Sequence, residues 1–250
     1  MKIKSYLLIA LIGINTLYAD TIGGEIALGF FNHYPEGVAS YTLSGNVANE
    51  SVDLEKSFGW ENENDMFFKA YLEHPFAFFP NIKIGYTALS HSGDSTVMDF
   101  SWGDIFSFDG TVQTNGNFKV YDITPYYEIL DNYAELDLGL TFRYIDGDIG
   151  VNTLFADEST DFEEFIPMLY AKAKVTIPST GIGLKAEANA IGSDATTFYD
   201  YEISARYTFI GGLGIEGGYK AFHLDSTELA DGLMVDTDFK GPYGAITWDF

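Results

Sequence analysis

The sequence predicts an all-β protein, an antiparallel up-and-down β-barrel that crosses a membrane with about ten strands, with eight or twelve as alternatives. Three observations support this fold. Short segments alternate between apolar and polar residues, and the connections between them alternate between long and short. After residue 19, no apolar stretch approaches the roughly 18 residues that indicate a transmembrane helix.

The composition excludes several classes of protein. The 250 residues include 37 acids, 13 bases and no cysteine, for a formal net charge of -24. A nucleic-acid-binding surface is basic, so we expect no nucleic-acid partner. Without cysteine the chain has no disulfide framework, no thiolate zinc site, no cysteine nucleophile and no lipid-modified N-terminal cysteine. Aromatic residues make up 16% of the chain, which is too many for a disordered acidic tail.

Residues 1–19 have the pattern of a secretory signal peptide. Lys2 and Lys4 form a basic start, an apolar run follows over residues 6–14, and Ala19 supplies a small residue at the cleavage position. The apolar run is too short to span a bilayer, which requires about 20 residues. We therefore expect export, cleavage before Asp20, and a single barrel domain over residues 20–250.

The alternation is clearest in residues 134–144, where apolar residues at even positions alternate with acidic, glycine, threonine and arginine residues. Residues 182–190 and 199–209 repeat this pattern. In a membrane barrel, one face of each strand contacts lipid and the other faces the lumen. We expect strands at residues 22–31, 66–74, 81–90, 117–128, 133–145, 165–177, 181–191, 198–209, 213–223 and 241–250.

The connections are typical of an outer-membrane barrel, which has short periplasmic turns and longer extracellular loops. The expected turns are residues 75–80, 129–132, 178–180 and 210–212. The expected loops are residues 32–65, 91–116, 146–164, 192–197 and 224–240. Pro125 and Pro167 fall inside expected strands, where proline cannot donate to the ladder, so we expect bulges or strand ends there.

The C-terminal strand carries a candidate assembly signal. Ile246, Trp248 and Phe250 share one face, and the chain ends on that phenylalanine. This arrangement resembles the signal by which bacterial outer-membrane proteins reach the barrel assembly machinery. We expect Trp248 and Phe250 to anchor at the periplasmic interface, where aromatic side chains gather.

Two stretches carry a wider resemblance: FFKAYLEHPFAFFPNIKIGYTALS at residues 67–90 and VYDITPYYEILDNYAELDLGLTFRYIDGDI at residues 120–149. Together with SVDLEKSFGW at residues 51–60, they resemble a family of short β-barrel proteins of the Gram-negative outer membrane. The resemblance covers nearly all of the chain after the signal peptide. It implies the fold and a place in the outer membrane, but no catalytic residue, because the family has no settled activity.

The alternation places eleven acids and eight bases on the lumen face. A lysine or arginine that faces lipid at the midplane costs about 2–4 kcal/mol, whereas a lumen charge can pair with a neighbour. We expect a packed network of ion pairs, with a thin charge-lined channel as the alternative. The residues are Glu25, Lys69, Glu73, Lys83, Asp122, Glu128, Glu135, Asp137, Arg143, Lys172, Lys174, Lys185, Glu187, Asp200, Glu202, Arg206, Glu216, Lys220 and Asp249.

The expected extracellular loops are strongly acidic: residues 32–64, 91–115, 146–164, 192–197 and 224–240 hold 23 acids, with only Lys56 and Lys240 as bases. They form a solvated rim or loosely bind Ca²⁺ or Mg²⁺ that bridges them to the anionic lipopolysaccharide of the outer leaflet. The densest cluster is Asp157, Glu158, Asp161, Glu163 and Glu164, without the spacing of an EF-hand. We expect no other cofactor, and a monomer surrounded by outer-membrane lipid.

Histidines near the extracellular strand ends raise the alternative of a hydrolase. His91 is followed by Ser92 and Asp94, and His223 by Asp225, and a histidine beside a carboxylate and a hydroxyl is the minimum set for hydrolysis. His33 lies at a similar height, and His74 lies at a periplasmic turn.

The hypothesis that we favour is a barrel without enzymatic activity, either structural or a narrow passive conduit for ions or small solutes. The first alternative is a surface interaction or adhesion barrel that uses residues 32–65 and 91–116. The second is an outer-membrane hydrolase of lipid or peptide with rim histidines.

Overall fold

The computed structural model describes residues 22–43, 48–76, 78–131, 133–192, 196–230 and 232–250. The signal peptide expected over residues 1–19 lies outside them. Within the described residues, no helix is long and apolar enough to cross a membrane.

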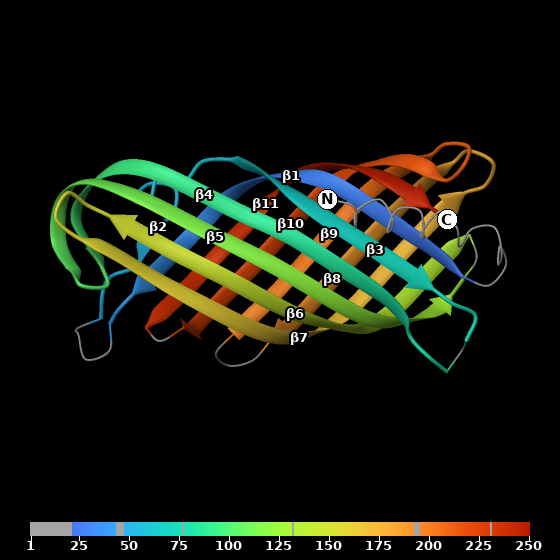
Figure 1. The fold of residues 1–250 in the computed structure, drawn as a ribbon, viewed down its shortest axis with the longest axis horizontal. Coiled ribbons are helices and arrows are strands. Elements are labelled where there is room, and N and C mark those ends of the chain that lie inside the picture. Colours follow the sequence, from blue (N-terminus) through green and yellow to red (C-terminus); the bar gives the residue numbers. More distant parts are fainter. Residues whose placement is uncertain (1–21, 44–47, 77, 132, 193–195, 231) are drawn as a thin grey trace, which may run out of the picture.

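The described chain forms one closed antiparallel sheet of ten long strands, with the two-residue strand β2 added at one point (Figure 1). The strands are β1 Gly23–Tyr41, β2 Val52–Asp53, β3 Glu63–Glu73, β4 Asn81–Trp102, β5 Ile105–Leu130, β6 Ala134–Asn152, β7 Asp157–Ile177, β8 Ile182–Gly192, β9 Thr196–Thr208, β10 Leu213–Ala230 and β11 Leu233–Asp249. The all-β, up-and-down barrel predicted from the alternation is confirmed.

The first and last long strands close the barrel. β1 pairs with β11 from Glu25 opposite Asp249 to Tyr41 opposite Leu233. Gly24 and Phe250 exchange two backbone hydrogen bonds, each 3.0 Å long, at the periplasmic end of this seam. Closure supplies partners for the backbone groups of both strands, which an open edge in hydrocarbon would leave unpaired.

Three of the expected extracellular loops are wrong, because strands continue through them. β4 and β5 form a hairpin that turns only at residues 103–104, so residues 91–116 are mostly strand. β6 and β7 extend through residues 146–164 in the same way, and β10 and β11 through residues 224–240. A membrane-spanning strand needs about 9–11 residues, whereas β4 has 22 and β5 has 26. The extra length projects beyond the membrane. The alternation of side chains between the two faces of the hairpin continues there as it does within the membrane.

The two prolines do not mark strand ends, contrary to the expectation. Pro167 lies within β7 opposite Phe142 of β6, two residues beyond Leu169, where the pairing of β7 with β8 stops. On the β8 side, the missing N–H of Pro167 therefore breaks no ladder bond. Pro125 lies within β5 opposite Ile82 of β4. The β5–β6 pairing is interrupted at Thr124 and Pro125 without a change of register, and the register shift of this ladder falls after Glu128.

An apolar belt surrounds the periplasmic half of the barrel. It includes the exposed side chains of Leu28, Phe30, Met66, Ile84, Ile123, Leu138, Leu140, Leu169, Leu184, Ile203, Ile215 and Ile246. Tyr34 and Tyr219 face outward at its extracellular edge, their hydroxyls 3.3 Å apart, and Trp248 and Phe250 lie at its periplasmic edge. Aromatic edges around an apolar band are the pattern of membrane interfaces.

One part of the extracellular wall is built by a loop instead of a strand ladder. The pairing of β3 with β4 stops at Phe67 opposite Thr87, although β4 continues to Trp102. Residues 54–60, which we call the wall segment, lie against β4 above this point. Their backbone approaches Gly93 so closely that a Cβ there would lie 2.3 Å from the carbonyl oxygen of Phe58.

Candidate functional site

The barrel interior has two layers of opposite character. Toward the periplasm, charged side chains fill it, and these form the ionic layer. Toward the extracellular end, aromatic and aliphatic side chains fill it, and these form the apolar layer. The boundary follows from the sequence of the inward positions, which change from charged to aromatic along β10 at Lys220 and Phe222.

The structure buries twelve of the charged side chains singled out in the sequence as lumen residues: Lys69, Lys83, Asp137, Arg143, Lys172, Lys185, Glu187, Asp200, Glu202, Arg206, Glu216 and Lys220. Lys174 and Glu135 form a half-exposed pair with an Nζ–Oε1 distance of 3.3 Å. Glu25, Asp122 and Asp249 join the same network, whereas Glu128 is exposed at the end of β5.

The centre of the ionic layer joins strands on opposite sides of the barrel. Lys69 of β3 pairs with Glu202 of β9, and Lys83 of β4 pairs with Glu187 of β8. Lys185 lies 3.2 Å from Glu202 and 3.0 Å from Glu216. The pairs made by Lys69 and Lys83 cross the lumen and block it, whereas those of Lys185 join the neighbouring strands β8, β9 and β10.

Arg143 and Arg206 are the two most highly bonded cations of this layer. Arg143 donates through Nε and Nη2 to both oxygens of Asp122, each at 2.7 Å, and through Nη1 to Asp200 at 2.6 Å. Arg206 donates to Glu216 at 2.7 Å and 3.0 Å, and also binds Glu25 and Asp249. Bidentate pairing satisfies the planar guanidinium and offsets the cost of removing it from water.

Little space remains in the ionic layer. One gap remains, and its volume is only about 10 Å³, measured as the space open to the centre of a water-sized sphere. Its lining includes Lys69, Lys83, Arg143, Glu187 and Glu202. That is roughly the volume that one water molecule needs. The polar lumen is therefore packed in this structure.

Lys220 lies at the boundary between the two layers and differs from its neighbours. Its Nζ donates to Thr87 Oγ1 at 3.0 Å and lies 4.6 Å from the ring centroid of Phe222. The rings of Phe67 and Phe31 lie 5.3 Å and 5.7 Å away. Among the described residues, no carboxylate oxygen lies within 4.0 Å of it, so its close neighbours are ring faces and a hydroxyl instead of an ion-pair partner.

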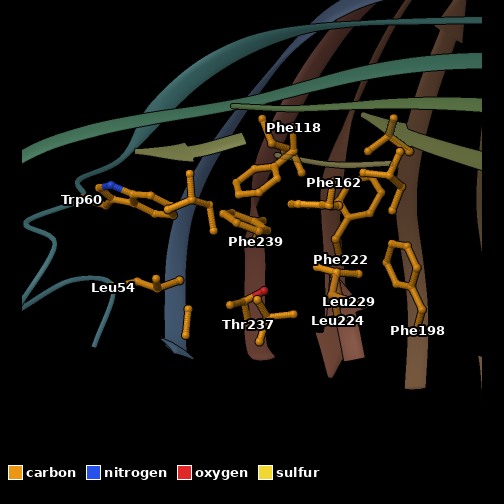
Figure 2. A pocket seen from close by; sticks show the side chains of 16 residues that line it. Leu54, Trp60, Phe118, Phe162, Phe198, Phe222, Leu224, Leu229, Thr237 and Phe239 are labelled. Atoms are coloured by element: carbon orange, nitrogen blue, oxygen red, sulfur yellow. The ribbon is translucent and has the colours of Figure 1, made fainter. Parts of the chain in front are cut away.

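Above this boundary the inward residues are apolar, and they enclose a cavity. Its wall comes from β1, β4–β7 and β9–β11, together with Leu54 and Trp60 of the wall segment (Figure 2). Trp60 Nε1 donates to Thr114 Oγ1 at 3.0 Å, and this hydroxyl donates to the Phe58 carbonyl at 2.8 Å. The wall segment is thus bound to β5 by buried hydrogen bonds.

Two of the rim histidines pack inside the wall. His33 Nε2 lies 3.2 Å from Asp65 Oδ2, and His91 Nδ1 lies 3.0 Å from the Glu61 carbonyl. The His91 ring is stacked between the rings of Trp60 and Phe239, with both centroids 5.3 Å away. Ser92 and Asp94, which follow His91 in the sequence, are exposed on the outer face and are not brought to the ring.

His223 lies on the outer wall. Its Nδ1 is 3.1 Å from Asp238 Oδ1 of β11, and its ring stacks on Tyr199 with a centroid distance of 4.7 Å. The carboxylate beside it is therefore Asp238 and not Asp225, which the sequence suggested. His74 lies in the β3–β4 turn, where its Nε2 is 3.2 Å from the Pro80 carbonyl.

The acidic cluster of the sequence lies on β7. Asp161 is directly opposite Asp148 of β6, and Glu163 is opposite Asp146. Lys119 balances Asp146 at 3.3 Å, and Asn117 donates to Asp148 at 3.0 Å. In the part of the chain that the structure describes, no three histidine, aspartate or glutamate side chains converge on a metal position.

The three residues of the candidate assembly signal lie on the outer face of the closing seam. Ile246 is opposite Leu28 and Trp248 is opposite Ile26 in the β1–β11 ladder. The rings of Trp248 and Phe250 lie 5.2 Å apart.

Sequence reasoning missed the apolar layer. Phe162, Val235 and Phe239 occupy inward positions in stretches that were expected to be loops. The sequence does contain this information. Every second residue of a strand faces inward, and the same count continued beyond the aromatic edge reaches these residues.

Comparison with known proteins supports the fold. The structure resembles the outer-membrane protease OmpT from Escherichia coli with a TM-score of 0.54 and 11% identity, over 92% of this chain and 97% of that one. Ail, the attachment invasion locus protein of Yersinia pestis, in complex with the heparin analogue sucrose octasulfate, matches at a TM-score of 0.36 and 11% identity, over 91% and 99% of the two chains. A Pseudomonas aeruginosa FadL homologue matches at 0.33 and 8%, over 92% and 90%.

At 11% identity, the likeness to OmpT concerns the fold alone. No protein-family model matches the chain, and no curated protein matches it by sequence. The closed barrel, its apolar belt and its aromatic edges are the features of an integral protein of the Gram-negative outer membrane. The protein is therefore an outer-membrane β-barrel, as the sequence predicts.

Proposed function

We propose that this barrel is closed to ions and serves as a rigid surface structure of the outer membrane, without a catalytic role. The observation that carries the proposal is the ionic layer, in which Lys69 and Lys83 reach carboxylates on the far wall and leave about 10 Å³ of free space. A passive conduit needs a continuous file of water, and a space of this size holds about one molecule. Ion pairs with buried partners do not separate easily, because each released charge would remain desolvated.

The test is single-channel conductance of the refolded protein without its signal peptide in a planar bilayer. Heat-modifiable gel mobility first verifies that the barrel has folded. We expect no conductance from the unmodified barrel. The variant Lys83→Ala/Glu187→Ala removes a whole ion pair, so it enlarges the lumen at constant net charge, and we expect it to conduct.

Reproducible steps from the unmodified barrel would contradict the closed structure and favour the conduit. In that case, the substitution of Lys172 and Lys174 by glutamate should shift its ion selectivity toward cations.

A specific observation favours surface interaction as a second candidate function. Four apolar side chains are strongly exposed where the hairpins project furthest: Met98 (86%), Phe106 (51%), Leu154 (83%) and Phe155 (85%). Exposed apolar groups far from the membrane belt are typical of contact surfaces. Bacteria that express the barrel should then autoaggregate, and Leu154→Ser/Phe155→Ser should reduce this. Equal aggregation would count against adhesion through this tip.

The support for a hydrolase is weaker. His91 is buried between two rings, and His223 has a carboxylate partner but stacks on the outer wall. The likeness to OmpT, a protease, concerns the fold alone. Turnover of a peptide or lipid by the purified barrel that is lost in His223→Ala would establish this alternative instead.

A further inference from the structure

The apolar layer contains a cavity that the proposed structural role does not use. Six aromatic rings line it, from Trp60, Phe118, Phe162, Phe198, Phe222 and Phe239 (Figure 2). Thr237 supplies the one side-chain hydroxyl among its lining residues, and the remaining contacts are aliphatic. Trp60 Nε1 is already occupied by Thr114.

The cavity is larger than packing defects usually are. Its volume is about 40 Å³, measured as the space open to the centre of a water-sized sphere. One water molecule needs about 10–15 Å³ by this measure. Protein interiors rarely contain voids larger than a water molecule. The polar gap below it admits only about 10 Å³ by the same measure. Of these two interior spaces, the one with apolar walls is therefore the larger.

Water is a poor occupant for this space. A buried water molecule makes about two to four hydrogen bonds, and the lining offers it a single hydroxyl. An ion is a worse occupant, because no ionisable side chain lines the cavity and a desolvated charge would be unpaired. The walls thus suit an uncharged apolar molecule, which gains by leaving water.

We propose that this cavity is a binding site for a small, uncharged, apolar molecule such as an aromatic hydrocarbon. The occupant is a free molecule and not the tail of a membrane lipid, because the extracellular end is covered. Asn49 Nδ2 donates to the carbonyls of Tyr41 at 2.7 Å and Gly103 at 3.1 Å, which draws the end of β1 to the β4–β5 turn. Trp102 is completely buried beneath this junction. A charged head group has no opening there.

The wall segment is the natural entrance. Leu54 and Trp60 line the cavity, and their segment completes the wall above the last β3–β4 pair. Side-chain and backbone bonds hold it, whereas a continuous ladder holds the neighbouring strands. Displacing it would open the cavity sideways without breaking the barrel.

The chain carries its own reporter, because Trp60 is one of only three tryptophans. The variant Trp102→Phe/Trp248→Phe leaves Trp60 as the single fluorophore, and Trp60→Phe/Trp102→Phe leaves Trp248 in the lipid-facing belt as the control. Both are reconstituted in the same phosphatidylcholine vesicles and titrated with bromobenzene, a quencher. We expect saturable quenching of Trp60 that toluene reverses, and unsaturated quenching of Trp248 that follows partition into the bilayer.

Filling the cavity should abolish the saturable component. Val235 lines it, so Val235→Phe in the Trp60-only chain should weaken bromobenzene binding at least about tenfold, which is 1.4 kcal/mol. Val175→Phe adds the same bulk to the lipid-facing wall and should have no effect. If Val235→Phe does not fold, Ala39→Leu fills another part of the same lining with a smaller change.

Three outcomes would overturn the proposal. The first is quenching of Trp60 that never saturates, and the second is saturable quenching that survives in a folded cavity-filling variant. The third concerns the source of the apolar group. If vesicles of dibrominated phosphatidylcholine quench Trp60 as strongly as Trp248, a lipid chain occupies the cavity instead of a free molecule. None of these readouts depends on conductance, so the proposed binding site and the proposed closed lumen can be refuted independently.

Discussion

Trp60 Nε1 and Thr114 Oγ1 lie 3.0 Å apart, and this hydrogen bond joins the first extracellular connection to β5. The same threonine hydroxyl donates to the Phe58 carbonyl, so one side chain satisfies two groups of the wall segment. Both partners are buried. The pair therefore holds in place the part of the wall that lacks a strand ladder.

Thr114→Val should destabilise the wall segment. The change keeps the shape but leaves Trp60 Nε1 and the Phe58 carbonyl without a partner, at a cost of about 1–3 kcal/mol in the free energy of unfolding. Urea denaturation of the Trp60-only chain would measure it. Thr111→Val, on an exposed position of the same strand, is the matched control and should change little. Equal stability of the two variants would mean that the bond does not hold the segment.

Gly93→Val should displace the wall segment without breaking a side-chain bond. A Cβ at this position would lie 2.3 Å from the Phe58 carbonyl oxygen and 2.5 Å from the Gly59 carbonyl carbon, and these are backbone atoms that cannot turn aside. Lys56 lies within the segment and is highly exposed, so trypsin cleavage after it should become several-fold faster. Gly244→Val is the control, because no atom lies within 4 Å of a Cβ there. Unchanged cleavage in Gly93→Val would show that the segment tolerates the displacement.

Arg143→Met should be among the most destabilising single changes in the lumen. It removes both hydrogen bonds to Asp122 and the one hydrogen bond to Asp200. Removing one partner of a buried ion pair lowers the free energy of unfolding by about 3–5 kcal/mol, because the other charge stays buried without a partner. Lys220→Met is the matched control, because it removes a buried cation that has no carboxylate within 4.0 Å. We expect it to change the free energy of unfolding by less than about 1 kcal/mol, or to stabilise the barrel. A larger loss from Lys220→Met than from Arg143→Met would contradict this account of the ionic layer.

The contrast between these two residues also marks how far sequence reasoning reaches. Alternation alone puts Arg143 and Lys220 on the lumen face, because each strand has a period of two. It cannot select their partners. Asp200 lies 57 positions from Arg143. The two meet only through the registers of three ladders, β6–β7, β7–β8 and β8–β9, and the curvature of the closed sheet.

The wall segment and the cavity were beyond the sequence for a different reason. Residues 54–60 do not alternate, and their position depends on the point at which the β3–β4 ladder stops. The strand extensions could have been predicted, since residues 97–113 continue the alternation of β4 and β5. The volume of the cavity depends on the rotamers of rings such as Phe118 and Phe222, which periodicity does not report.

The turn at the start of the wall segment should respond to acid. Asp53 Oδ1 accepts from the backbone N–H of Glu55 and Lys56, and Oδ2 lies 2.8 Å from Lys56 Nζ. Partial burial alone would raise the pKa of Asp53, but the hydrogen bonds and charge of Lys56 outweigh it and lower this pKa. A lowered pKa in the folded state stabilises the turn above about pH 4 and loses that effect as the pH falls through the folded value.

The emission of the Trp60-only chain measures this response. Between pH 7 and pH 2, we expect a red shift that begins below about pH 4, because the released turn exposes Trp60 to water. In Asp53→Asn the carboxylate is absent at every pH, so this step should disappear. A step of the same size in Asp53→Asn would assign the acid response to another group.

Asp161→Asn should stabilise the extracellular part of the barrel. Asp161 lies directly opposite Asp148 in the β6–β7 ladder, and like charges that face each other across two strands repel by roughly 0.2–1 kcal/mol. Asp157→Asn removes the same charge from the same strand, but its cross-strand neighbour is Asn152, so no repulsion is relieved and no gain is expected. Thermal unfolding with a chelator present would compare them.

If Mg²⁺ bridges the pair, as the acidic composition of this region suggests, millimolar MgCl₂ should stabilise the unmodified barrel and reduce its difference from Asp161→Asn. A difference that does not change with Mg²⁺ would mean that no cation binds between these two strands.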